Sequence, residues 1–196
     1  MRHMWPSERI GTRSAFYEQS GDHSIGVREL CERLSAPYHA VSFNQGANGM
    51  AIRLRQACVT DIPAVYRGEE SYIRCWEPEH EITWRLQLER HLTRWVENFE
   101  RLTIALMGDH FAGYSLWAPD QGLAELSTIH VVADHRRSGV GMALLEAYAL
   151  DAAAQGFTQL RLSVRPDNPA KLMYQKAGFL CTGTGAHGYL TYERHA

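Results

Sequence analysis

The sequence predicts an α/β domain in which a central mixed β-sheet is flanked by helices. Apolar residues alternate with polar ones in several short segments and recur at helical spacing in others, and the C-terminal half follows the order β-α-β-α-β. At the centre of that order, a strand predicted at 123–132 runs into a basic, glycine-containing turn at 136–141 and then into an apolar helix. The 196 residues leave room for one such domain and an appendage.

The first 50 residues differ from the rest of the chain. Glycine and serine are scattered through them, and only residues 27–34 show helical spacing. From Ala51 the pattern sharpens, so we divide the chain into a loop-rich extension at 1–50 and a domain at 51–196. A chain that begins at Met50 is expected to keep the fold and the chemistry. The alternative is that the 27–34 helix packs on the domain and covers a functional surface.

The domain is predicted to open with a strand and two helices. Residues 52–55 alternate apolar and charged side chains, which is typical of a half-buried strand. Asp61 and Pro63 then supply a helix start, and this helix is expected to end near Glu70. A long second helix is predicted at 79–99, because its apolar residues recur at helical spacing: Ile82, Leu86, Leu92, Trp95, Val96 and Phe99.

A hairpin and two βα units complete the expected sheet. The Gly108-Asp109 turn joins two alternating segments, and Pro169 stands in the first turn of a helix that ends near Gly178. Trp84, Trp95 and Trp117 are expected in the core. The remaining segments are strands at 102–106, 112–117, 123–132, 159–164, 180–182 and 189–192, and a helix at about 139–155.

Composition narrows the classes of function. The formal net charge of −2 shows no excess of positive charge of the kind that binds nucleic acid or a membrane surface. The four cysteines lie far apart without metal-ligand spacing, so we expect no metal and interpret the thiols as reduced in a cytoplasmic protein. No apolar run approaches the length of a membrane span, and no signal peptide is visible.

The turn at 136–141 has the features of an anion site. The first-turn N–H groups of the following helix have no intrahelical partner and point out of its end. Gly139 and Gly141 allow a ligand to approach the backbone closely, while Arg136 and Arg137 add positive charge. The turn therefore suits a pyrophosphate.

Two further strings follow the Arg-x-x-Gly-x-Gly turn at the expected distance: Asn168-Pro169-Ala170 leading to Tyr174, and then Gly178-Phe179. With these strings, the layout from residue 51 to the C-terminus resembles the GNAT acyl-CoA N-acyltransferases. A dinucleotide-binding fingerprint is the competing interpretation, but it has Gly-x-Gly-x-x-Gly after the first strand of a βαβ unit. The resemblance implies the GNAT fold and acetyl-CoA as the acyl donor.

The resemblance implies a binding site for the acyl-CoA. The turn at 136–141 would wrap the pyrophosphate, and the strand before it would separate from its neighbour, so that main-chain groups of Ile129 and Val131 meet the pantetheine arm. Asn168 would contact the same arm, or it caps the next helix instead. The expected acyl-CoA-binding residues are Ile129, Val131, Val132, Arg136, Arg137, Ser138, Gly139, Val140, Gly141 and Asn168.

The resemblance also implies the catalytic residues. Tyr174 matches the general acid of the family, since a phenol stays protonated at neutral pH and can donate a proton to the leaving thiolate. Glu125 occupies the place of the catalytic glutamate of histone-type members and is the candidate general base. His130, expected on the opposite face of the same strand, is an alternative relay. Tyr174 and Glu125 could instead serve only packing and solvation.

Acceptor specificity is expected from residues 69–77, interpreted as a segment between the first two helices. Its aromatic and acidic side chains, notably Glu70, Tyr72 and Trp76, would hold a cationic amine by charge and cation–π contact. A solvated loop is the other interpretation. Ser163 stands where ribosomal-protein N-terminal acetyltransferases have a glutamate, which weakens assignment to that branch.

These observations predict an N-acetyltransferase that moves acetyl from acetyl-CoA to a primary amine by direct attack in a ternary complex. The acceptor is a small amine or amino acid, or an amine of a peptide or protein. The sequence does not decide between a monomer and a homodimer. The alternative is a regulatory module that binds acyl-CoA without turnover.

Overall fold

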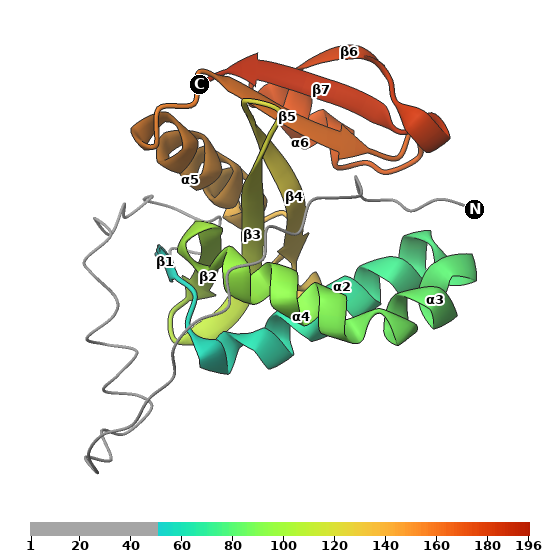
Figure 1. Ribbon diagram of the computed structural model, residues 1–196. Coiled ribbons are helices and arrows are strands. Elements are labelled where there is room, and N and C mark those ends of the chain that lie inside the picture. Colours follow the sequence, from blue (N-terminus) through green and yellow to red (C-terminus); the bar gives the residue numbers. More distant parts are fainter. Residues whose placement is uncertain (1–50) are drawn as a thin grey trace, which may run out of the picture.

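The computed structural model describes residues 51–196 (Figure 1). The predictions for residues 1–50, including the 27–34 helix and the dispensable extension, lie outside the described residues. Within the described part, no helix is both long and apolar enough to cross a membrane.

The core of the fold is a seven-stranded mixed sheet with the strand order β1-β2-β3-β4-β5-β7-β6. Neighbouring strands are antiparallel except for β4 and β5, which are parallel. The predicted α/β class and the β2–β3 hairpin at Gly108 are confirmed. The strands are β1 (Ile52–Gln56), β2 (Leu102–Met107), β3 (His110–Asp120), β4 (Leu123–Val131), β5 (Gln159–Val164), β6 (Leu180–Thr184) and β7 (Leu190–His195).

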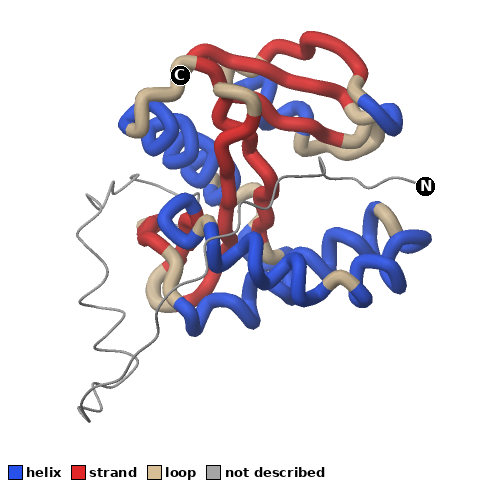
Figure 2. The backbone as a smooth tube through the Cα atoms, in the orientation of Figure 1, coloured by secondary structure: helices blue, strands red, loops and turns tan. Residues whose placement is uncertain are grey.

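Helices cover both faces of the sheet. In Figures 1 and 2 the long strands β3 and β4 run between one group of helices, α2 to α4, and a second group that holds α5 and α6. The α-helices are α2 (Ile62–Trp76), α3 (Glu81–Leu86), α4 (Leu88–Glu97), α5 (Val140–Ala154) and α6 (Lys171–Lys176). Short 3-10 turns occupy Val59–Asp61, Pro78–His80, Phe99–Arg101, Ala133–His135 and Ala186–Gly188.

Each face of the sheet has its own apolar core. On one face, Leu145 and Tyr148 of α5 pack with Tyr174 of α6 over β4, β5 and β7. On the other face, Val65 of α2 and Trp95 of α4 pack on β2 and β3. The predicted burial of Trp84, Trp95 and Trp117 is confirmed. A ligand held between β4 and β5 would therefore lie between two packed layers.

Two helix predictions need correction. α2 does not end near Glu70 but continues to Trp76, because Ile73 is buried on the same helix as Val65 and extends its apolar face. Residues 69–77 are thus mostly helix rather than a connecting loop.

The helix predicted at 79–99 is broken at Gln87 into α3 and α4. Its buried face is also different, since Ile82 and Leu86 are exposed while Trp84, His91 and Trp95 are buried. These three rings follow one another in a stack, with centroids 5.2 and 6.3 Å apart. Aromatic packing against α2 and the sheet therefore outweighs the aliphatic periodicity.

Candidate active site

A gap opens between β4 and β5 in the middle of the sheet. The two strands pair only where Ala124–Leu126 faces Leu160–Leu162. Beyond Leu126, β4 stays paired with β3 as far as Val131, while β5 stays paired with β7 as far as Val164. The two halves of the sheet therefore separate along one edge of β4, where its backbone pairs with no other strand of the described part of the chain.

A β-bulge at Ser127 changes which residues of β4 share a face. Leu126 pairs with Trp117 and Thr128 with Leu116, so Ser127 is the extra residue. As a result Glu125 and His130 pair with Ala118 and Tyr114, which lie on one face of β3. The expectation that His130 lies on the opposite face from Glu125 is wrong, because the bulge shifts the alternation by one residue.

The free edge of β4 presents main-chain groups to the gap. The Val132 N–H donates to the carbonyl of Ala112 in β3 at 3.0 Å. Because the backbone direction alternates along an antiparallel strand, the N–H and C=O groups of Ile129 and Val131 point to the opposite side, toward β5. The side chains of both residues pack in the layer below α5.

The turn at 136–141 leads from this strand to the first turn of α5. Gly139 has φ +92° and directly precedes α5, whose first turn has no side-chain cap among the described residues. A Cβ on Gly141 would lie 2.8 Å from Met173 Sδ, so glycine allows α5 to approach α6 closely. Arg136 and Arg137 are exposed. The turn thus combines exposed positive charge with free helix N–H groups.

Tyr174 and Asn168 lie at the other side of the gap. Tyr174 is 5% exposed and packs against Phe179 and Tyr192, with ring centroids 6.5 and 6.4 Å away. Burial raises the pKa of the Tyr174 hydroxyl above its usual value, so the hydroxyl stays protonated at neutral pH. Asn168 is also buried, and its Oδ1 accepts a hydrogen bond from the Ala170 N–H at 2.9 Å, which stabilises the turn before α6.

Glu125 lies beside the last paired residues of β4 and β5. Arg161 of β5 donates to the Glu125 carboxylate and also to Asp120. Burial raises the pKa of Glu125, and the hydrogen bond from Arg161 opposes that rise. On the same face, burial lowers the pKa of His130 to about 4, so the imidazole is neutral at pH 7.

We predict that Glu125→Gln lowers acetyl transfer at neutral pH and that the loss shrinks as the pH rises. An alkaline medium supplies free amine without a base, so the contribution of the Glu125 carboxylate falls as the pH rises. The measurement is kcat/KM for an accepted amine against pH. A variant with the wild-type pH profile of kcat/KM would show that Glu125 takes no part in the chemistry. The unfolding temperatures of the variant and the wild type, measured at the same pH values, report the effect of losing the Arg161 ion pair on stability.

A second buried carboxylate, Glu69, faces β4 from α2. The Tyr114 hydroxyl donates to Glu69 Oε1 at 2.7 Å. Burial is the largest influence on Glu69 and raises its pKa, while Tyr114 and Thr128 lower it by hydrogen bonding. In the sequence Glu69 is only one residue of the 69–77 segment, and nothing in its spacing distinguishes it from a surface glutamate.

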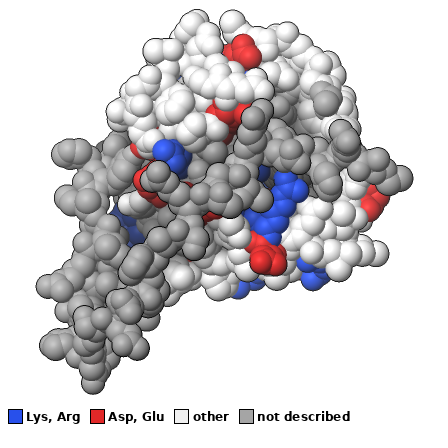
Figure 3. All heavy atoms as spheres, in the orientation of Figure 1, with Lys and Arg blue, Asp and Glu red and all other residues white. Residues whose placement is uncertain are grey.

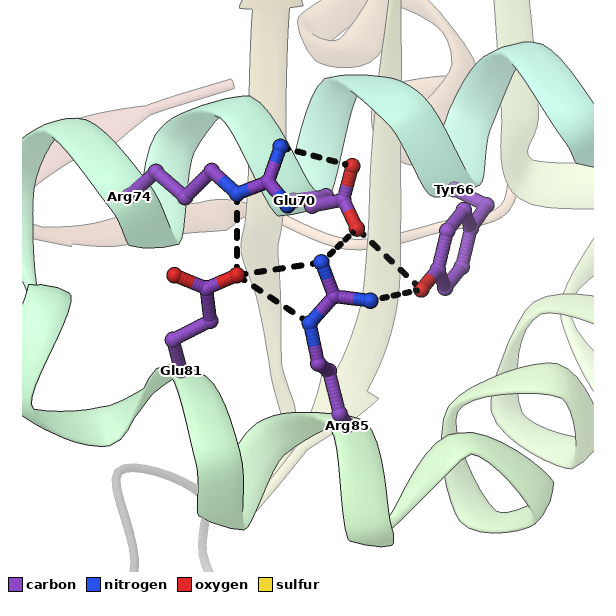
Figure 4. A network of polar contacts seen from close by, with 5 residues as sticks. All are labelled: Tyr66, Glu70, Arg74, Glu81 and Arg85. Carbon is purple, nitrogen blue, oxygen red and sulfur yellow. Dashed lines mark hydrogen bonds and ion pairs between the residues drawn. The ribbon is translucent and has the colours of Figure 1, made fainter.

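Glu70 lies in a polar network that joins α2 to α3 (Figure 4). Arg85 Nη2 is 2.6 Å from Glu70 Oε1, and Arg74 Nη1 is 3.3 Å from Oε2. Tyr66 also donates to Glu70, and both arginines contact Glu81. Both Glu70 oxygens already bind arginine, so an acceptor cation would have to displace one of them.

Tyr72, by contrast, lies close to the gap. Burial raises the pKa of its hydroxyl, and the next influences are the neighbouring Glu77, Tyr189 and Tyr174. Tyr72 comes from the α2 layer and Tyr174 from the α6 layer on the opposite face of the sheet, so they approach where β4 and β5 are separated. Trp76 is half-buried one turn further along α2. The structure thus brings Tyr72 toward Tyr174 and leaves Glu70 in a separate cluster.

Glu77 and Tyr189 join Tyr72 in this place, and sequence reasoning did not single them out. Glu77 ends α2, with its N–H bonded to the Ile73 carbonyl at 2.8 Å. It is 1% exposed, and the Tyr189 hydroxyl donates to its Oε1. Tyr189 directly precedes β7, which pairs with β5 near Val164. Residues 112 positions apart in sequence meet here, which no local pattern reveals.

Comparison with known proteins decides the family. The model of the Acetyltransferase (GNAT) family matches residues 65–179, which is more than half of the chain. The chain belongs to the GNAT acetyltransferase family. The strands that flank the gap and the turn at 136–141 lie within the matched segment. This GNAT chain is therefore an acyltransferase, and the resemblance found in its motifs is confirmed.

Solved structures show the same fold in other GNAT proteins. The PaiA N-acetyltransferase of Thermoplasma acidophilum, in complex with coenzyme A, is 17% identical with a TM-score of 0.64 and covers 75% of this chain and 100% of that one. The ribosomal-protein-alanine N-acetyltransferase of Brucella melitensis is 21% identical, with a TM-score of 0.61 and coverages of 73% and 99%. Ard1 of Thermoplasma volcanium is 24% identical, with a TM-score of 0.56 and coverages of 74% and 97%. A search of curated proteins gives no match.

One face of this GNAT chain carries charges of both signs. On the face drawn in Figure 3, basic and acidic side chains are interspersed among uncharged ones. Among residues 51–196 no group of His, Cys, Asp and Glu side chains has an arrangement that could hold a metal ion. Cys58, Cys75 and Cys181 are free thiols.

Proposed function

We propose that the protein transfers the acetyl group of acetyl-CoA to a primary amine by direct attack in a ternary complex. The observation that carries the proposal is the separation of β4 from β5 after Leu126, directly before the turn at 136–141. One continuous stretch of chain thus supplies an unpaired strand edge for the acyl-CoA arm and an anion site for its pyrophosphate.

Acetyl-CoA binding follows from the edge of β4 that faces the gap. Its Val131 carbonyl accepts a hydrogen bond from Arg136 Nε at 3.2 Å, and the cofactor arm would replace that donor. The pantetheine arm lies along Ile129 and Val131 and takes the hydrogen bonds that a neighbouring strand would make. The pyrophosphate lies on residues 136–141, where the N–H groups of the α5 first turn and the two exposed arginines meet it. Val132, Ser138 and Val140 complete this turn, and Asn168 shapes the opposite side.

The chemistry then needs one acid and one base. The amine nitrogen attacks the thioester carbonyl carbon, and a backbone N–H near Val131 stabilises the developing oxyanion. As the carbon–sulfur bond breaks, the Tyr174 hydroxyl gives its proton to the CoA sulfur. Glu125 takes the proton that the amine loses, directly or through water. The products are an N-acetyl amine and free CoA, so no covalent enzyme intermediate is needed.

The acceptor enters from the α2 side of the gap. Tyr72 and Trp76 line that side, while Glu70 contributes by fixing α2 against α3. The Brucella melitensis neighbour is named for the alanine of a ribosomal protein. The acceptor class proposed for this chain includes small amines, amino acids and amines of peptides or proteins. The three free thiols fit a protein that works in the cytoplasm.

The test is a CoA-release assay with acetyl-CoA and a broad panel of amines, followed by mass spectrometry of the products. We expect one amine class to gain 42 Da, roughly the mass of an added acetyl group that replaces a proton. Tight acetyl-CoA binding without CoA release for any amine would contradict the proposal and favour a regulatory acyl-CoA-binding module instead. Buried Tyr174 beside the gap argues against that second function.

A further inference from the structure

The Glu77 carboxylate is buried with only one of its oxygens satisfied. Oε1 accepts the hydrogen bond from Tyr189, whereas Oε2 is buried and has no hydrogen-bond partner among residues 51–196. An unpaired carboxylate oxygen in the interior lowers the free energy of unfolding, so it is rare unless something supplies the missing partner. The unpaired oxygen of Glu77 therefore suits the binding of a ligand that donates a hydrogen bond, and it does not stabilise the fold.

The surroundings of Glu77 place it at the acceptor side of the gap. Burial raises the pKa of the Tyr72 hydroxyl, and the nearby Glu77, Tyr189 and Tyr174 raise it further. Arg165 is the nearby cation. Its guanidinium makes two hydrogen bonds to Asp167, at 3.1 and 3.2 Å, and it also hydrogen-bonds the Tyr189 hydroxyl, so it reaches Glu77 only through Tyr189. We call Tyr72, Glu77, Tyr174 and Tyr189 the tyrosine–glutamate cluster. Its one carboxylate among three hydroxyls favours a cation with N–H donors.

The cation bound there is different from the reacting nitrogen. The reacting amine must lose its proton to Glu125 before it attacks, and a second carboxylate in contact with it that takes no proton would stabilise the ammonium form. A group that stays charged throughout the reaction meets no such conflict. Glu77 is thus suited to a positive charge elsewhere on the acceptor.

We propose that Glu77 binds a second cationic group of the acceptor, so that the preferred substrates are diamines, polyamines or amines that adjoin a basic side chain. The inference rests on the proposed acetyl transfer and narrows its acceptor class. Glu77 acts in binding, while Tyr189 positions its carboxylate by the hydrogen bond to Oε1.

The experiment measures amine binding to the full chain saturated with CoA, by calorimetry, with a four-carbon diamine and with butylamine as probes. The wild-type protein is expected to bind the diamine more tightly. Glu77→Gln should weaken diamine binding roughly ten- to one-hundred-fold, the span of a lost hydrogen bond to a charged group. Its affinities for butylamine and CoA should stay the same. Equal binding of the two probes by the wild-type protein would overturn the proposal.

Two variants separate binding from folding. Glu79→Gln changes an exposed glutamate two residues away and should keep the diamine affinity, while Tyr189→Phe should lose part of it. Glu77→Gln should unfold at the wild-type temperature or higher, because it removes an unpaired buried charge. A lower unfolding temperature with unchanged diamine affinity would assign Glu77 a structural role only.

The same measurements distinguish this inference from the proposed function. Diamine binding that depends on Glu77, without acetyl transfer to any amine, would support the site and contradict the transfer. Acetyl transfer that shows no dependence on Glu77 would support the transfer and overturn the inference.

Discussion

Tyr174→Phe is expected to lower turnover roughly one hundred- to ten-thousand-fold, the span of a lost general acid, with little change in acetyl-CoA affinity. The phenylalanine ring keeps the packing against Phe179 and Tyr192, so only the hydroxyl is removed. Because burial raises the pKa of this hydroxyl, the wild-type acid stays in its protonated form throughout the neutral range. Steady-state kcat together with acetyl-CoA binding by calorimetry measures the effect.

Tyr192→Phe is the matched control for this prediction. Tyr192 is a buried tyrosine of the same core, and its hydroxyl accepts a hydrogen bond from Gln175 Nε2 at 3.1 Å. Loss of that hydroxyl should leave kcat at the wild-type level. Wild-type turnover in both variants would show that Tyr174 only packs in the core.

Gly139→Asp is expected to abolish CoA binding. A side chain at this position has room, since the nearest atom to an added Cβ is Ile52 Cδ1 at 3.6 Å. The carboxylate, however, would stand beside the first turn of α5, where the proposed pyrophosphate lies, and like charges repel. Calorimetry with CoA measures the loss, and circular dichroism reports whether the fold is retained.

Gly139→Asn separates charge from backbone strain in this prediction. The φ of +92° strains any side chain, and asparagine has the same shape as aspartate and tolerates positive φ comparatively well. We expect Asn to weaken CoA binding far less than Asp does. Undiminished CoA affinity in a folded Gly139→Asp variant would show that the pyrophosphate lies elsewhere.

Much of the architecture could be predicted from local patterns. The alternation at 52–55, the Gly108 turn and the βα order after residue 123 all appear in the structure where they were expected. Each of these signals is short-range, because a strand or a turn is encoded by neighbours two to four residues apart. Burial of three tryptophans follows from their large apolar surface in the same way.

Predictions failed where a distant contact outweighed the local pattern. The 79–99 helix breaks because Trp84, His91 and Trp95 stack in the core instead of the aliphatic residues. His130 changes face because one extra residue, Ser127, is accommodated against β3. Neither the break nor the bulge has a proline or glycine to announce it.

By itself the sequence determined the αβ order, the glycine turn before α5 and the presence of a tyrosine and a glutamate suited to acyl transfer. Only the tertiary structure decided how these groups meet. It separates β4 from β5 after Leu126, so that Tyr174 from one layer approaches Tyr72 from the other. It also ties Glu70 to two arginines and leaves one oxygen of Glu77 unpaired. The reason is physical: backbone propensity acts over a few residues, whereas the partner of a buried charge is chosen by the packing of segments far apart in the chain.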